Sequence, residues 1–349
     1  MDDPLSAALR LQSSVCAHLG SPFNAALLQA AAADPAPPLR ALFAPWEGRP
    51  REALMADAVA LRFVGALHDL VLDAAAPDLA RFFPPHADAA RAWPAALAAI
   101  EDHGARIQAF MGHEPQTNEV GRAACLLPGF LTVGRRTRLP LRCLELGASA
   151  GLNQLWPQLR YRYGAWGTWG DPASPVCLEA EWRGSPPPLG VAVTVVETAA
   201  CDRAPVRLSD PAARRRLAAY VWPDQAERLE RLQRAVRMAL AAGVAVEAGD
   251  AVDWVRSTAA PRPGLATVIY HSVFWQYLAA GAQQALAEAI ADHGAAASDD
   301  APLAWLRMEP GAGASPFELR LSVWPGGLDC RLATVHAHGA WIDWGGLAD

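Results

Sequence analysis

A glycine-containing turn near the middle of the chain carries the residues best suited to chemistry. The apolar run 144–146 contains one acid, Glu145, and leads into the turn 147–151 (Gly-Ala-Ser-Ala-Gly) before an apolar segment resumes. This pattern is typical of a strand, a tight turn and a helix, where small residues let the main chain approach a ligand. Two chemistries use such a turn: a nucleotide-like cofactor bound beside Glu145, or a hydrolase nucleophile elbow with Ser149 in Gly-x-Ser-x-Gly.

Polar side chains also follow three later segments that we predict to be strands. They are Asp202, Asp250 and the adjacent pair His271 and Ser272. Ligands of an open parallel sheet bind at the carboxyl ends of the strands, near the reversal of strand order. We therefore expect these side chains and the glycine turn to lie at one edge of the sheet. The predicted strands are 144–146, 191–196, 244–247, 266–270 and 304–308.

His271 is the best candidate for a general base, because the pKa of histidine suits proton transfer at neutral pH. A helix cap or a hydrogen-bonded packing role fits this histidine equally well. His68 differs, because it lies on the apolar stripe of a helix predicted over residues 51–74. We expect His68 to be a hydrogen-bonded residue of the core.

The rest of the chain supplies the elements that position these residues. Residues 1 to about 111 are predicted to be helical, because alanine and leucine dominate and strand-like runs are missing. Strands and helices alternate from 141 to 310, which predicts a parallel sheet with helices on both faces. Alternating segments at 317–324 and 330–336 flank a Pro-Gly-Gly turn and predict an antiparallel hairpin. The aromatic segment 161–184 is predicted to be an inserted hairpin that includes a half-exposed strand over residues 176–182.

The polar segment Gln116–Arg122 separates the helical region from the glycine turn. Thr117 or Asn118 could cap the helix that follows. Alternatively, a helix over 116–122 lies against the turn and presents Asn118, Glu119 or Arg122 to a ligand. The residues themselves leave both interpretations open.

Composition excludes several classes of chemistry. The chain has 349 residues, is 52% hydrophobic and 19% charged, and carries a formal net charge of −6. These values indicate a sizeable core and argue against nucleic-acid and membrane-surface partners. All 30 basic residues are arginines, which excludes Schiff-base catalysis, a lysine general base and a P-loop lysine.

The six cysteines form no Cys-x-x-Cys pair and have no zinc-binding spacing to histidine. We therefore expect them to be buried small apolar residues, and we expect no metal site. The N-terminal sequence has no basic region followed by an apolar core, so no signal peptide is expected. No apolar run reaches the roughly 18 residues that a bilayer span needs, and the sequence predicts a cytoplasmic protein.

Six segments carry a resemblance to known families. They are Gln116–Arg122, Leu144–Asn153, Val221–Gln225, Gly249–Ala251, His271–Trp275 and Trp324–Gly327. The chain resembles the Rossmann-like S-adenosylmethionine-dependent methyltransferases. It resembles more closely an uncharacterised bacterial family, a domain of unknown function placed near those enzymes.

The resemblance implies a fold and a division into domains. The implied fold is α/β, with a mostly parallel Rossmann-like methyltransferase sheet, an antiparallel C-terminal hairpin and an N-terminal all-helical cap. Residues 1–115 would form the cap, and residues 116–349 would form the S-adenosylmethionine-binding domain with its insertion near 161–184. The segment 116–122 would be the junction between them.

The resemblance also implies roles for particular residues. Asp202 would bind the ribose of S-adenosylmethionine, with Glu197 as a competitor for that role, and Arg122 would pair with the cofactor carboxylate. The residues implied to hold the methionine part are Glu145, Gly147, Ala148, Ser149 and Gly151. Those implied for the adenine are Asp250 and Ala251, and Asn118, His271 and Ser272 complete the expected cofactor site.

The expected activity is methyl transfer to an unidentified small-molecule acceptor. No Asn-Pro-Pro-Tyr motif follows the fourth strand, so methylation of amino groups of bases or glutamine is not supported. A serine hydrolase is the first alternative, with Ser149 as nucleophile and His336 or His338 as base. Helices before the turn, the missing His-Gly-Gly loop and the charge of Glu145 argue against it. A non-catalytic, methyltransferase-like binding protein is the second alternative, and the oligomeric state is not predicted.

Overall fold

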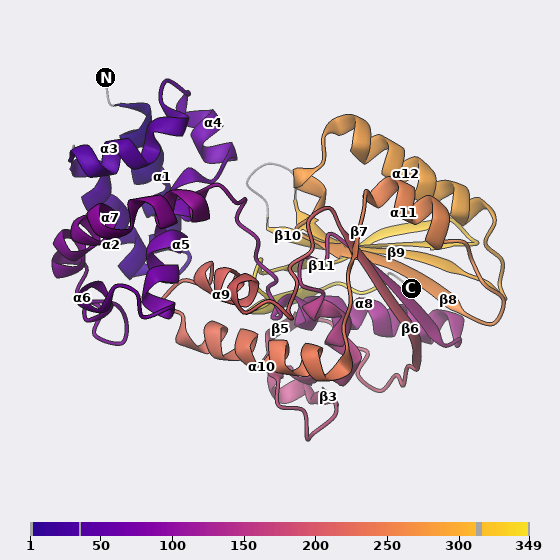
Figure 1. The fold of residues 1–349 in the computed structure, drawn as a ribbon. Helices are drawn as coiled ribbons and strands as arrows, with labels where there is room; N and C mark the ends of the chain where they lie inside the picture. Colours follow the sequence, from indigo (N-terminus) through magenta and orange to yellow (C-terminus); the bar gives the residue numbers. More distant parts are fainter. Residues whose placement is uncertain (1–2, 35, 312–315, 348–349) are drawn as a thin grey trace. The chain divides into compact units, whose positions relative to one another are not determined.

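The structure is a computed structural model that describes residues 3–34, 36–311 and 316–347 (Figure 1). The chain divides into two compact units. The first unit comprises Met1–Thr117 and Arg207–Gln233, and the second comprises Asn118–Val206 and Arg234–Asp349. The resemblance implies one domain for residues 116–349, whereas Arg207–Gln233 pack with the N-terminal helices.

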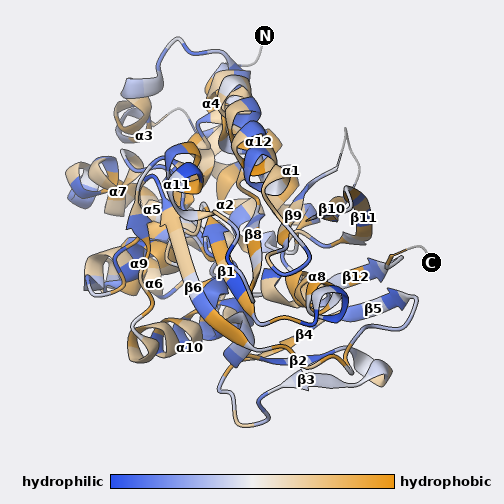
Figure 2. Ribbon diagram, turned by 90° about the vertical axis from the view of Figure 1, so that its right-hand side faces the viewer, coloured by the Kyte–Doolittle hydropathy of each residue, from blue (hydrophilic) through white to orange (hydrophobic). Residues whose placement is uncertain are grey.

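The first unit is helical, as predicted for the N-terminal residues. Proline occupies the first turn of five of its helices, where its missing N–H costs no hydrogen bond. Apolar residues dominate α2 and α5 (Figure 2). The helices are α1 Pro4–His18, α2 Pro22–Ala33, α3 Pro37–Phe43, α4 Arg51–Ala56, α5 Val59–Leu72, α6 Pro77–Ala80, α7 Ala89–Met111 and α9 Pro211–Ala219, with the first residues of α10 Ala226–Ala242.

The predicted single helix over 51–74 is two helices, α4 and α5. Ala58 separates them, because its left-handed φ of 50° cannot continue an α-helix. His68 of α5 is 4% exposed, and its Nδ1 lies 3.1 Å from the carbonyl oxygen of Ala219. The expectation of a hydrogen-bonded core histidine is therefore confirmed.

A nine-stranded, mostly parallel sheet forms the centre of the second unit. Its strand order is β5-β12-β11-β10-β9-β8-β1-β6-β7, and the five strands from β9 to β7 are parallel neighbours. The antiparallel C-terminal hairpin is confirmed as β10 and β11. The strands are β1 Leu141–Leu146, β5 Glu181–Gly184, β6 Val195–Asp202, β7 Glu247–Ala248, β8 Ala266–Ser272, β9 Leu303–Pro310, β10 Phe317–Trp324, β11 Leu328–Val335 and β12 Trp341–Trp344.

Helices cover both faces of this sheet (Figure 1). On one face α8 (Arg122–Thr137) contributes Phe130, whose ring stacks on Trp156 with centroids 4.2 Å apart and meets Tyr270 edge-on. On the other face α11 (Ala251–Thr258) and α12 (Ala280–Ala295) close a cluster that includes Leu144, Ile269 and Trp305. The two faces therefore have separate cores, and the direction of a strand side chain decides which core it joins.

The inserted aromatic segment divides between two sheets. β2 (Arg160–Arg162) pairs antiparallel with β3 (Thr168–Gly170), which gives the expected hairpin, and β4 (Cys177–Glu179) adds on the other side. The run 176–182 is not the single strand predicted. Ala180 still donates to Arg162 of the small sheet, whereas Glu181 donates to Ala340, and the chain continues as β5 beside β12.

Four of the six cysteines are buried as expected, whereas Cys177 is exposed and Cys330 is half-buried. Within the described ranges, no helix combines the length and the apolar character needed to cross a membrane.

Candidate functional site

The glycine turn lies where the strand order of the sheet reverses. β6 and β7 extend the sheet on one side of β1, and β8 and β9 extend it on the other. Such a reversal opens a crevice at the carboxyl ends of the two central strands. Gly147, Ser149 and Gly151 have left-handed φ values of 63°, 53° and 74°. The conformation suits glycine, but it is strained at Ser149, and such strain concentrates at functional sites.

Asp202 holds this turn from the neighbouring strand. Its Oδ2 accepts a hydrogen bond of 2.8 Å from the Ser149 N–H, and its Oδ1 accepts one of 2.8 Å from Ala204. Ala148 N–H donates to the Cys201 carbonyl at 3.1 Å. The structure thus brings Asp202 to the turn.

Glu197 lies at the opposite end of the same strand. Five residues of extended chain separate it from Asp202, or roughly 16 Å at about 3.3 Å per residue. Its carboxylate pairs with the fully buried Arg142 at 2.8 Å and with Arg262 at 2.7 Å. Of the two competing acids, only Asp202 is near the glycine turn.

Glu145 is a deeply buried acid beside the turn. It is 3% exposed and lies opposite Tyr270 of β8, whose hydroxyl donates to its Oε2 at 3.2 Å. Burial raises the pKa of the Glu145 carboxyl to about 8, and the negative charge of Asp202 adds to this effect. Hydrogen bonds from Tyr270 and Asn153 and the positive charge of Arg122 lower the pKa, but burial outweighs them.

Two buried polar atoms at the turn have no hydrogen-bond partner among the described residues. They are Oγ of Ser149, which is 6% exposed, and Oδ1 of Asn153, which is 1% exposed. Buried polar atoms in folded proteins almost always have a partner. Two exceptions within five positions of the turn mark it as a place where a polar ligand group would be accommodated.

The segment before α8 braces the turn but forms no helix. α8 begins at Arg122, and its cap residue Gly121 makes no side-chain hydrogen bond, so the predicted cap at Thr117 or Asn118 is wrong. Asn118 Oδ1 instead accepts a hydrogen bond of 2.7 Å from Leu152 N–H, just after the turn. This buried contact joins two segments that are 34 residues apart in the sequence, so the rules for helix caps, which concern neighbouring residues, could not predict it.

Two further residues of this segment are also buried. Glu119 Oε1 accepts from Gly121 N–H at 2.9 Å. The Arg122 guanidinium donates to the carbonyl oxygens of Ala337, at 3.1 Å, and Ser272, at 3.4 Å. Arg122 thereby connects the turn after β11 with the end of β8, and its pairing with a cofactor carboxylate stays a prediction.

His271 faces away from Glu145. Because Glu145 pairs with Tyr270 and successive strand residues point to opposite faces, His271 lies on the face covered by α11 and α12. Its Nε2 accepts from the Trp305 indole N–H at 3.1 Å, so Nδ1 carries the proton and donates to Glu309 Oε1 at 2.6 Å. Both ring nitrogens are engaged, and a general-base role would require one of these bonds to break.

Glu309 is not among the residues that the sequence predicts for the site. Its carboxyl group also accepts from the Phe274 N–H at 3.0 Å, and so ties the loop after β8 to the end of β9. The signal was available, because an acid directly after a predicted strand is the feature that singled out Asp202 and Asp250.

The loop after β8 is strained and touches the glycine turn. Val273 has a φ of 56°, which is unusual for a β-branched residue. The residue after Val273 is Phe274, and a Cβ atom added to Gly147 would overlap its ring. A non-glycine residue with a left-handed φ therefore follows each central strand, Ser149 after β1 and Val273 after β8. The ring of Phe274 lies against Gly147 where the two loops meet.

Asp250 and Ala251 begin α11 at the same edge of the sheet. Asp250 Oδ1 caps the helix by accepting from the N–H groups of Val252, at 2.8 Å, and Asp253, at 3.3 Å. Gly249 N–H donates to the Asp202 carbonyl at 3.0 Å, so the predicted adenine and ribose residues follow adjacent strands. Both capping hydrogen bonds use Oδ1 of this exposed side chain, and Oδ2 takes no part in the cap.

Comparison with protein families decides the classification of the chain. The model of the DUF2332 family, described as "Uncharacterized protein conserved in bacteria", matches residues 6–344. The chain belongs to this family. The expected resemblance to an uncharacterised bacterial family is thus confirmed, and the resemblance to methyltransferases stays a prediction. No curated protein and no solved structure matches the chain.

The hydrolase alternative requires a base beside Ser149, and no described residue fills this role. The left-handed φ of Ser149 fits a strained elbow. Its hydroxyl, however, has no hydrogen-bond partner in the part of the chain that the structure describes. His336 lies in the turn after β11, where its Nδ1 accepts from the N–H of His338 at 3.1 Å. A short 3₁₀ helix, η2 (Leu152–Gln158), follows the turn in place of the α-helix of an elbow.

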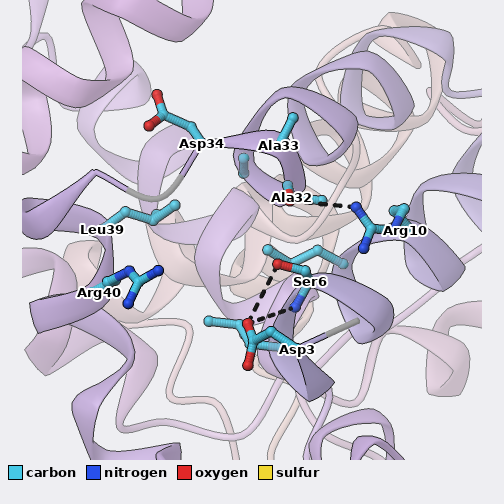
Figure 3. A pocket seen from close by; sticks show the side chains of 11 residues that line it. Asp3, Ser6, Arg10, Ala32, Ala33, Asp34, Leu39 and Arg40 are labelled. Carbon is cyan, nitrogen blue, oxygen red and sulfur yellow. Dashed lines mark hydrogen bonds between the residues drawn. The ribbon is translucent and has the colours of Figure 1, made fainter. Parts of the chain in front are cut away.

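A separate cavity of about 360 Å³ lies in the first unit. Arg10 and Arg40 stand on opposite sides of it, and Asp3 and Asp34 also contribute to its wall (Figure 3). Arg10 donates to the Ala32 carbonyl, and Asp34 accepts from Trp93. The two charges of each sign balance, and no predicted site residue lines this cavity.

Proposed function

We propose that this protein is an S-adenosylmethionine-dependent methyltransferase that acts on a small-molecule acceptor. The observation that supports it most is the strained glycine turn at the reversal of strand order, held by Asp202 of the adjacent strand. The parallel order β7-β6-β1-β8-β9 agrees with a Rossmann-like sheet, in which nucleotide cofactors bind at this place.

The residues at the turn fit such a cofactor. Ser149 Oγ and Asn153 Oδ1 are buried atoms that lack partners among the described residues. Each carboxylate oxygen of Asp202 accepts one hydrogen bond and keeps acceptor capacity for a ribose hydroxyl. Asp250 uses Oδ1 as a cap, and its Oδ2 suits an adenine amino group.

In this proposal the chain's own residues bind and orient. Glu145 and the turn 147–151 hold the methionine part, Asp202 holds the ribose, and Asp250 with Ala251 contacts the adenine. Bound S-adenosylmethionine supplies an already activated methyl group. The main contribution of the protein is therefore in-line positioning of the acceptor and exclusion of water.

We assign His271 a positioning role in this function. Its proton on Nδ1 orients Glu309, and Glu309 holds the N–H of Phe274. Phe274 in turn packs on Gly147. His271 thus acts on the glycine turn through two other residues and needs no contact with the reacting atoms.

The test is calorimetric titration of the full chain with S-adenosylmethionine and S-adenosylhomocysteine. We expect one-to-one binding in the micromolar range. Asp202→Asn should weaken it by roughly 1–3 kcal/mol, because a charged acceptor is lost. Glu197→Gln changes the other end of the same strand and should leave affinity unchanged.

Failure to bind either ligand, with circular dichroism showing a folded protein, would overturn the proposal. Ester hydrolysis that disappears in Ser149→Ala would then favour the hydrolase. Folded protein without either property would favour a non-catalytic binding protein.

A further inference from the structure

We propose that Glu145 is protonated in the ligand-free protein and that binding of an amine-bearing ligand expels this proton, so that affinity increases with pH through the neutral range. The inference rests on the proposed function, since S-adenosylmethionine and S-adenosylhomocysteine both carry a primary amine. At the same site, the amine of the ligand would determine whether Glu145 holds its proton, and the pH would determine the affinity for the ligand.

The surroundings of Glu145 contain no cation in direct contact. Its hydrogen-bond partners, the Tyr270 hydroxyl and the Asn153 amide, are neutral groups, and no ion pair joins Glu145 to any described residue. Of the other titratable groups nearby, Asp202 and Cys201 belong to β6, and Arg122 belongs to α8. The positive charge of Arg122 acts on Glu145 through space.

A carboxyl group in this setting favours its neutral form. An ionised carboxylate that is 97% shielded from water loses its hydration, and one phenol hydroxyl with one amide does not replace it. The raised pKa of Glu145, about 8, agrees with this geometry. Without a ligand, the residue is therefore mainly protonated at neutral pH.

Three groups around the turn suit an ammonium ion. Protonated amines have three N–H donors and no acceptor. Glu145 supplies a carboxylate once it ionises, and Asn153 Oδ1 and Ser149 Oγ are buried atoms lacking a partner among the described residues. Asn153 also hydrogen-bonds to Glu145 itself, which places its amide beside the carboxyl group.

The proton balance follows from these contacts. The ligand arrives as R–NH₃⁺, the O–H bond of the Glu145 carboxyl breaks, and the proton passes to solvent. The resulting carboxylate pairs with the ammonium group, and no other bond changes. Because the bound state carries one proton fewer at Glu145, mass action makes the association constant rise with pH until Glu145 is ionised without the ligand.

The experiment measures the affinity of S-adenosylhomocysteine for the full chain between pH 6 and pH 9, in buffers of different ionisation enthalpy. We expect the association constant to rise roughly tenfold per pH unit below about pH 7.5 and to level above pH 8. Close to one proton should be released at pH 6.5. The probe 5′-methylthioadenosine, which has the same nucleoside without the amine, should bind with no such slope.

Two variants separate Glu145 from other titrating groups. Glu145→Gln should bind S-adenosylhomocysteine more weakly than the wild type at pH 8 and lose the pH dependence. Asp250→Asn should lower affinity at every pH but keep the slope, because Asp250 does not contact Glu145. If Glu145→Gln fails to fold, Tyr270→Phe replaces it and should move the levelling point to higher pH.

The outcomes distinguish the two proposals. Binding of S-adenosylhomocysteine with a pH-independent affinity, or with a slope that Glu145→Gln retains, would overturn the proton linkage and leave the proposed function standing. An absence of binding at every pH would overturn the proposed function itself.

Discussion

Glu145 of β1 and Tyr270 of β8 lie side by side on neighbouring parallel strands, and the Tyr270 hydroxyl donates to the Glu145 carboxyl over 3.2 Å. Both side chains are buried on the face of the sheet that α8 covers. Glu145 lies two residues before the glycine turn, so the contact connects this turn with the adjacent central strand. The hydrogen bond from Tyr270 also favours the ionised form of Glu145 and so lowers the pKa of this carboxyl group.

Tyr270→Phe should therefore destabilise the protein more at high pH than at low pH. A lost hydrogen bond to a buried group costs about 1–2 kcal/mol, and more when the partner is charged. The measurement is urea unfolding at pH 6 and pH 9. Tyr161→Phe is the matched control, because it removes an equally buried hydroxyl that donates to the main-chain oxygen of Trp156. Equal losses at both pH values for Tyr270→Phe would contradict the assignment.

His68 should make the first unit less stable as the pH falls. Burial lowers the pKa of His68 from its ordinary value near 6.5 to about 4. Between these values the unfolded chain binds a proton at His68 that the folded chain does not. The contribution of neutral His68 to the free energy of unfolding is therefore fully present above pH 6.5 and declines toward pH 4. The contribution at stake is on the order of 3 kcal/mol.

The measurement is the midpoint of thermal unfolding between pH 4 and pH 7. His68→Asn keeps a donor for the Ala219 carbonyl but does not titrate, so its midpoint should fall less steeply over this range. A parallel decline in both proteins would show that other groups cause the acid sensitivity.

Gly147→Ala should destabilise the turn through two effects. The left-handed φ of 63° strains any residue with a Cβ atom, and the new methyl group would overlap Phe274. Together they should cost about 2–4 kcal/mol in urea unfolding. Gly249→Ala is the control, because nothing lies within 4 Å of its Cβ position and its φ is not left-handed. In a Phe274→Ala background the cost of Gly147→Ala should fall to the strain alone, and an unchanged cost would exclude the overlap.

Glu309→Gln should loosen the loop after β8. Oε1 accepts from both His271 Nδ1 and Phe274 N–H, and Oε2 also accepts from Phe274 N–H at 3.2 Å. The amide keeps one oxygen for these donors but loses the negative charge and the second acceptor, so the hydrogen bonds to two buried donors weaken. We expect a loss of about 1–3 kcal/mol in urea unfolding, together with a change in tryptophan fluorescence from Trp305. Glu318→Gln, which disrupts ion pairs of the neighbouring β10, should cost less than about 1 kcal/mol. If Glu309→Gln and Glu318→Gln lowered the free energy of unfolding equally, Glu309 would have no special role in positioning the loop.

Local patterns predicted many elements correctly. The helical N-terminal region, the strand before the glycine turn and the hairpin of β10 and β11 all follow from periodicity and turn residues. Asp202 and Asp250 lie at strand ends beside the turn because parallel strands bring their carboxyl ends to one edge. Such predictions succeed because the information is contained within a few consecutive residues.

Other features depend on partners distant in the sequence. Asn118 does not cap the nearby helix, because the N–H of Leu152, 34 residues later, is available to its side chain. The run 176–182 divides because Glu181 pairs with β12 rather than with the small sheet. The segment Arg207–Gln233 joins the first unit through contacts such as that of Tyr220 with Gly65.

The sequence by itself determined that this chain has an acid, a glycine turn and further polar residues at the ends of successive strands. Only the tertiary structure decided which of these residues share a face. Because side chains alternate along a strand, the register of β1 and β8 places Glu145 with Tyr270 and sends His271 to the opposite core, where Trp305 and Glu309 engage it. Register is set by hydrogen bonds between strands far apart in the chain, and periodicity within one strand cannot predict it.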